Sequence, residues 1–183
     1  MATFMPPRPP SSSNDPVAQL CPACGLCCNG VLFADVELRQ DDVPEALLSL
    51  GLTVRRKGRG DKQCFRQPCP AFQDCRCDIY SSRPVQCRAF ECGQLKRVSA
   101  GVLSAEAALK TIRRARRQVD RVTSLLRQSG NYEETRPLTA RYRRVMVQPI
   151  DLAQGDGEGD LRGQLMLAMR DLMHLLHAEF LQG

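Results

Sequence analysis

The sequence contains no tryptophan, and aromatic residues make up only 5% of its 183 residues. A core must therefore come mainly from leucine, valine, alanine and methionine, within a hydrophobic fraction of 43%. No apolar run approaches the ~20 residues that a membrane helix needs, so we expect no membrane span. The first residues, MATFMPPRPPSSSNDP, lack the apolar stretch of a secretory signal and the arginines of a transit peptide. We therefore expect a cytoplasmic protein.

Common catalytic motifs are also missing. The sequence has no G-x-S-x-G, no P-loop, no dinucleotide-binding fingerprint and no H-E-x-x-H. Its only histidines, His174 and His177, follow the last cysteine by about 80 residues. They share a helix face but have no third ligand in reach, so we interpret them as partly exposed helix residues. Any activity would be centred on a metal, and the sequence leaves open whether the chain is an enzyme.

Cysteine, in contrast, is abundant, with ten residues that all lie between positions 21 and 92. In the cytoplasm, clustered cysteines indicate a metal or catalysis more often than disulfides, although an even number would allow full pairing. Thiolate surroundings select zinc, copper(I) or iron–sulfur centres. The spacing is Cys21-x2-Cys24-x2-Cys27-Cys28, a gap of 35 residues, then Cys64-x4-Cys69-x5-Cys75-x-Cys77-x9-Cys87-x4-Cys92.

The first cysteine block carries the sharper signal. Its C-x2-C-x2-C run matches the first three ligands of a bacterial ferredoxin and favours an iron–sulfur cluster over zinc. The fourth ferredoxin cysteine is missing, so a further thiolate has to come from the second block. Gly25 can supply a positive φ in the turn. Cys27 and Cys28 are adjacent, and successive side chains point apart, so we expect one of them to serve a second metal or a different iron.

Three segments carry a family resemblance: CPACGLCC at 21–28, CPAF at 69–72 and CDIYSSRPVQCRAF at 77–90. Together they resemble the YkgJ-like cysteine-cluster family, the CxxCxxCC family described as chelating zinc or iron. The resemblance covers roughly residues 17 to 95. It implies a set of core metal ligands: Cys21, Cys24, Cys27, Cys28, Cys69, Cys77 and Cys87.

Seven thiolates are one short of two closed tetrahedral sites, so either Cys64 or Cys92 completes the set or one site is open. Cys75 is expected to be a bystander or a ligand that replaces one of the others. One branch of the family is flagellin lysine N-methylase, so the resemblance implies an enzyme related to protein lysine N-methylases, or an accessory to one, as an alternative function.

The expected fold is mainly α, with an irregular, metal-stabilised Cys-rich N-terminal domain and few short strands. Residues 1–16, with five prolines and three consecutive serines, are expected to form a disordered tail. Residues 17–98 would form the Cys-cluster metal-binding domain, and residues 99–183 a helical extension.

Apolar residues spaced three and four apart predict a long amphipathic helix over 104–128, with Ser104 as N-cap and Gly130 as stop. An Asp41–Asp42 cap predicts a short helix that ends at Gly51. Residues 155–160, GDGEGD, are expected to be a linker. Further helices are predicted at 85–98, 139–147 and 160–180, and short strands at 31–33 and 52–57. A helix over 85–98 would put Cys92 and Cys87 on different faces, which weakens Cys92 as a ligand to the same ion as Cys87.

Charge is unevenly distributed along the chain, which has a formal charge of +6. Residues 96–127 carry nine basic and two acidic side chains. A basic helix can bind phosphates, which makes a nucleic-acid-binding module a further alternative; a solvated helix face explains the same pattern, and aromatic stacking platforms are missing. The sequence also leaves open whether the chain binds a protein partner. The helix would offer Arg113, Arg114, Arg116, Arg117 and Arg121. We interpret Arg76, Arg83 and Arg88 as partners of anionic thiolates.

Overall fold

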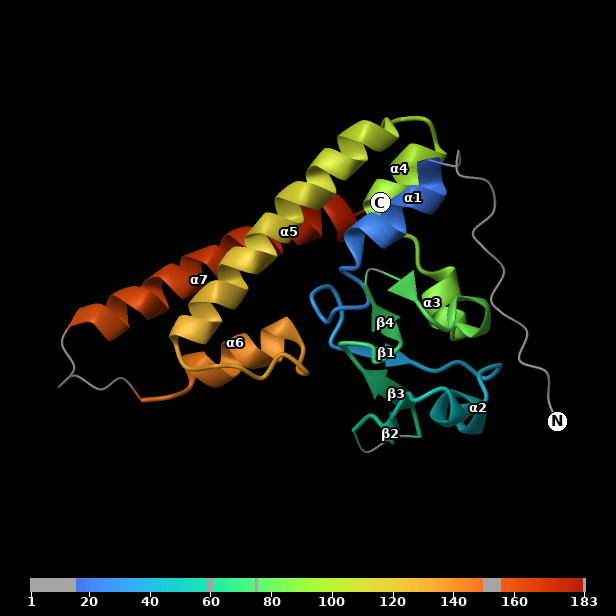
Figure 1. Ribbon diagram of the computed structural model, residues 1–183, viewed down its shortest axis with the longest axis horizontal. Helices are drawn as coiled ribbons and strands as arrows, with labels where there is room; N and C mark the ends of the chain where they lie inside the picture. The colour runs from blue at the N-terminus through green and yellow to red at the C-terminus, as the bar shows by residue number, and fades with distance from the viewer. Residues whose placement is uncertain (1–15, 59–60, 75, 150–155, 183) are drawn as a thin grey trace.

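The computed structural model describes residues 16–58, 61–74, 76–149 and 156–182. Helix accounts for 55% of the chain and strand for 9%, which confirms a mainly α fold with few short strands (Figure 1). The tail expected over residues 1–16 lies outside the described residues, except that Pro16 begins a helix. In the described part, no helix is long and apolar enough to cross a membrane.

Two long helices, α5 (Ala105–Gln128) and α7 (Asp156–Leu176), lie side by side and form the larger core (Figure 1). The short helix α6 (Leu138–Met146) follows α5 at one end of the pair, and α1 (Pro16–Cys24) and α4 (Gly93–Ser99) pack at the other. The π-helical turn η3 (His177–Leu181) continues α7. The buried apolar residues that α5 and α7 contribute to the core include Ala108, Ile112, Ala115, Val122, Leu126, Leu165, Met169, Leu172 and Leu176.

Helix α5 follows its predicted boundaries because its sequence supplies both end signals. The Ser104 hydroxyl accepts a hydrogen bond from the Ala107 backbone N–H at 3.2 Å. After the helix, Gly130 adopts a φ of 76°, which favours glycine. Helix α7 begins at Asp156, four residues before the predicted start, so most of the segment expected to be a linker is helical.

The Cys-rich region holds the strands. β1 (Asp35–Glu37), β3 (Gln63–Arg66) and β2 (Val54–Arg56) form an antiparallel sheet in that order, and β4 (Phe72–Gln73) pairs with β5 (Arg76–Cys77). Helix α2 (Pro44–Ser49), the turn η1 (Tyr80–Ser82) and α3 (Val85–Ala89) lie beside them. A second, smaller core consists of Val36, Leu47, Leu52, Phe65, Ala71 and Ile79.

Two sequence predictions in this region were wrong. The strand expected at 31–33 is a bend, since the Leu32 N–H donates to the Leu26 carbonyl at 3.0 Å and Val31 is buried in the larger core. Asp42 does not cap α2, because Val43 occupies the N-cap position and Pro44 begins the helix. Its carboxylate instead accepts from the backbone N–H of Arg39 and of Val85, both at 2.8 Å. It therefore ties the loop before α2 to the start of α3.

The continuous helix expected over 85–98 is in fact two helices, α3 and α4, separated by residues 90–92. Phe90 is extended, with φ −78° and ψ 121°, and its ring packs edge-on against Phe33, with ring centroids 4.9 Å apart. Cys92 is also extended and caps α4. The break arises from tertiary contacts that sequence periodicity does not report, and it changes the direction in which Cys92 can reach.

The larger core draws on both sides of the domain boundary expected at 98/99. Leu20, Leu26 and Val31 from the Cys-rich region are buried in the same cluster as the side chains of α5 and α7. The division of the chain at this boundary stays a prediction.

Candidate metal centre

The first cysteine block is held by the end of α1 and the turn that follows it. Cys21 and Cys24 are three apart on α1 and so share a face. Gly25 ends the helix with a φ of 69°, as its sequence context predicted. The N–H groups of Cys28 and Asn29 both donate to the Gly25 carbonyl at 3.0 Å. This tight turn gives the adjacent residues Cys27 and Cys28 different surroundings.

Cys27 lies among the thiols of α1 and of the segment before α4. Burial raises the pKa of the Cys27 thiol well above its ordinary value, and the nearby thiols of Cys24, Cys28, Cys92 and Cys21 raise it further. Burial likewise raises the pKa of Cys24 to about 12, with Cys92 and Cys21 adding to the rise. Cys92 also raises the pKa of Cys21, second to burial. We call Cys21, Cys24, Cys27 and Cys92 group A.

Cys28 has another set of neighbours. Burial raises the pKa of its thiol to about 12, and Cys69, Cys77 and Cys87, in that order, raise it further, ahead of Cys21. The pKa of Cys87 also reaches about 12, through burial first and then through Cys69 and Cys77. A backbone hydrogen bond of 2.8 Å from the Cys69 N–H to the Cys28 carbonyl joins the two cysteine blocks. We call Cys28, Cys69, Cys77 and Cys87 group B.

The two flanking cysteines have different locations. Cys92 is in group A, at the break that the sequence did not predict. Cys64 is fully buried in β3 and lies apart from both groups. Burial raises the pKa of its thiol, and the charged groups around it are Arg55, Asp35, Lys57 and Glu37. Cys75, the expected bystander, lies outside the described residues.

The two groups are sets of neighbouring thiols rather than finished coordination shells. Across the described ranges, no three histidine, cysteine, aspartate or glutamate side chains form a ready metal-binding set. The donor chemistry nevertheless fits zinc or iron, because each group offers four sulfur atoms and no histidine. Burial raises the pKa of the thiols of Cys21, Cys24, Cys27, Cys28, Cys69, Cys77 and Cys87, so a metal would have to displace their protons on binding.

A comparison with known families agrees with this chemistry. Residues 20–119, more than half of the chain, match the model of the CxxCxxCC family, described as "Putative zinc- or iron-chelating domain". The chain belongs to this family. No curated protein and no solved structure matches it. The CxxCxxCC match runs from α1 into α5 and includes all eight cysteines of groups A and B.

Two arginines lie close to the thiols of this CxxCxxCC domain. Arg83 lowers the pKa of Cys21 in group A and of Cys77 and Cys87 in group B, against the larger effect of burial. It therefore lies near both groups, in line with its interpretation as a partner of anionic thiolates. Arg116 lowers the pKa of Cys24 and donates to the Ala23 carbonyl at 2.9 Å.

The charge pattern of the sequence placed Arg116 on a phosphate-binding helix face and did not predict its contacts with Cys24 and Ala23. It is 92 residues from Cys24 along the chain, and only the packing of α1 on α5 brings the two together. No local pattern in the sequence carries that information.

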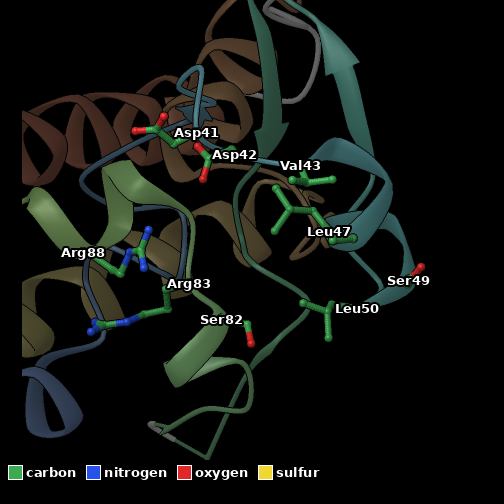
Figure 2. Close-up of a pocket in the computed structure, with 10 residues that line it drawn as sticks. Asp41, Asp42, Val43, Leu47, Ser49, Leu50, Ser82, Arg83 and Arg88 are labelled. Carbon is green, nitrogen blue, oxygen red and sulfur yellow. The ribbon is translucent and has the colours of Figure 1, made fainter.

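An open groove of about 410 Å³ borders α3, the helix that carries Cys87 (Figure 2). Val43, Leu47 and Leu50 line one side, and Arg83 and Arg88 line the other. Leu47 also belongs to the smaller core, against which Cys69, Cys77 and Cys87 pack. The groove thus lies next to the side chains that surround group B.

Proposed function

We propose that this CxxCxxCC protein holds two metal centres, one on the thiolates of group A and one on those of group B. The observation that carries the proposal is that Cys27 and Cys28, although adjacent, have different neighbours: Cys27 lies near Cys24 and Cys92, whereas Cys28 lies near Cys69, Cys77 and Cys87 and accepts a hydrogen bond from the Cys69 N–H. A single shared centre would require these adjacent side chains to converge. Two groups of four account for eight of the ten cysteines and use Cys92 rather than Cys64.

The centres bind zinc or iron, and the C-x2-C-x2-C run favours an iron–sulfur cluster. Four protein thiolates fill a tetrahedral site and leave no open position, which suits structural or redox work rather than Lewis-acid catalysis. Two divalent ions with four thiolates each would carry a charge of about −4 in all. Among the described residues, Arg83 and Arg116 lie close to the thiols and would offset about half of that charge.

Anaerobic purification followed by metal, acid-labile sulfide and visible-absorption analysis tests this function. We expect either two zinc ions per chain and no visible band, or iron with acid-labile sulfide and a brown protein. The zinc result would indicate structural centres, and the iron–sulfide result would indicate redox or sensing centres. A reduced, folded chain that takes up neither zinc nor iron would contradict the proposal.

The cationic face of α5 supports nucleic-acid binding as a second candidate function. Lys110, Arg113, Arg117 and Arg121 are exposed, and none of them makes a hydrogen bond or ion pair with the described residues. Lys110, Arg117 and Arg121 lie seven and four residues apart and so share one face. Acidic side chains on this helix are limited to Glu106 and Asp120. Such a face would release counterions when it neutralises phosphates.

Salt-dependent binding to duplex DNA or RNA of mixed sequence tests the second candidate. Four phosphate contacts predict a slope of about −3.6 in a plot of log K against log salt for a duplex. Exchange of Arg117 and Arg121 for glutamine should lower that slope by about 2, whereas the control Arg170→Gln, on α7, should leave it unchanged. Equal binding by all three proteins would exclude α5 as the contact surface.

A further inference from the structure

The C-terminal turn η3 touches the start of α4, directly after Cys92 (Figure 1). A Cβ atom placed on Gly93 would lie 2.6 Å from the backbone oxygen of Gln182 and 2.8 Å from that of Glu179. Both distances are shorter than real Cβ contacts, and the atoms that would have to move belong to the main chain. Only glycine at position 93 allows the two backbones to approach this closely.

Polar side chains of α4 bind the same turn. The amide of Gln94, which is 1% exposed, donates to the Glu179 carbonyl at 2.9 Å and to its carboxylate at 3.0 Å. Arg97 donates to the same carbonyl at 3.3 Å and forms an ion pair with the carboxylate. The hydrogen bond from Arg97 is the main reason that the pKa of Glu179 is lowered. Both the backbone carbonyl and the side-chain carboxylate of Glu179 therefore bind residues of α4.

The turn also shares a core with group A. Phe180 is 1% exposed and belongs to the larger apolar cluster. Cys24 and Cys92 are partly buried against that cluster. Cys69, Cys77 and Cys87 of group B pack instead against the smaller core. The C-terminal turn thus shares its apolar core with two thiols of group A, whereas three thiols of group B pack against the other core.

We propose that the contact of Glu179 and Gly93 positions Cys92, so that the turn η3 completes the metal centre of group A. Three thiols of this group come from residues 21–27, and Cys92 must be brought to them by packing alone. Helix α4 has seven residues, which is too short to hold a fixed position without tertiary contacts. Its contacts are with α1, α5 and η3. This inference rests on the proposed function and adds a role for the C-terminal extension.

Two variants and two matched controls test the inference in the full-length, metal-loaded protein. Gly93→Ala forces the backbones apart, and Glu179→Ala removes the ion pair. Gly163→Ala adds a methyl to a helical glycine of α7 that has nothing within 4 Å, and Asp171→Ala removes an exposed acid of α7 that pairs with Arg170. Elemental analysis gives the metal content. Timed alkylation with iodoacetamide, followed by peptide mass spectrometry, reports the protection of each thiol, because metal-bound thiolates react slowly.

We expect Gly93→Ala and Glu179→Ala to lose metal from group A alone. Cys21, Cys24, Cys27 and Cys92 should be alkylated about 10-fold to 100-fold faster than in the wild type, the usual effect on metal affinity of losing a residue that orients a ligand. Group B should keep its protection, and both controls should match the wild type.

Uniform exposure of all eight thiols in the two variants, or wild-type protection throughout, would overturn the inference while leaving the proposed function intact. A wild-type chain that holds no metal would instead refute the proposed function, and this inference with it.

Discussion

Gly25 lies in the turn between Cys24 and Cys27 of group A, and its replacement by alanine should destabilise the protein for two separable reasons. Its φ of 69° is in the left-handed region, where a side chain costs about 1–2 kcal/mol. A Cβ at this position would also lie 2.5 Å from Cζ of the Phe72 ring. Overpacking of this kind costs about 1–3 kcal/mol, and the half-buried Phe72 ring can swing, so we expect the lower end. The total is about 2–3 kcal/mol.

The control for this change is Gly130→Ala. Gly130 has a similar φ of 76°, but an added Cβ would have nothing within 4 Å, so only the backbone cost of about 1–2 kcal/mol remains. Thermal unfolding of the metal-loaded proteins should then place the melting temperature of Gly25→Ala about 2–4 °C below that of Gly130→Ala. The difference is the cost of displacing Phe72.

A double-mutant cycle tests whether the extra destabilisation of Gly25→Ala comes from its contact with Phe72. In a Phe72→Ala background the clash is absent, and Gly25→Ala should cost only as much as Gly130→Ala. Phe72 pairs with Cys77 across the β4–β5 ladder, so its displacement should also make Cys77 more reactive toward iodoacetamide. An equal cost of Gly25→Ala in both backgrounds would show that the Phe72 contact has no part in the stability of the turn.

Three further predictions concern the metal centres. Cys27→Ser should lose only the group A metal, and Cys28→Ser only that of group B; identical alkylation patterns in the two variants would contradict the division. Arg83→Gln should weaken metal binding by both groups, whereas a loss confined to one group would contradict its shared position. The metal-free chain should lose stability as the pH rises above the ordinary thiol pKa of 9.0, because its buried thiols, such as Cys24 with a pKa of about 12, ionise more easily when unfolded. Denaturant titration at pH 8 and pH 10 measures this effect, and equal stabilities would contradict it.

The features that could be predicted from the sequence are those that depend on residues close together along the chain. The apolar repeat of α5 and its Ser104 cap are local, and so are the positive φ of Gly25 and the divergence of Cys27 and Cys28. The family segments predicted a domain that chelates zinc or iron, which agrees with the description of the matched family; the preference for an iron–sulfur cluster stays a prediction.

What could not be predicted depends on contacts between distant segments. The break between α3 and α4 follows the packing of Phe90 on Phe33, whereas Gly93, the poor helix former nearby, lies inside α4 and not at the break. That break puts Cys92 in group A. The expectation that Cys92 is a weak candidate for the ion of Cys87 stays a prediction, and the single helix on which it rested does not exist. The contacts of Arg116 with Cys24, and of Glu179 with Gln94 of α4, likewise depend on tertiary packing.

X-ray absorption at the metal edge of the anaerobically purified protein tests the central claim most directly. Two centres built from groups A and B predict sulfur as the only ligand atom: four per metal at ~2.3 Å for zinc, or thiolate and sulfide around each iron of a cluster. A fit that requires nitrogen or oxygen ligands from the protein would contradict centres made of these eight thiolates. So would a single metal atom per chain.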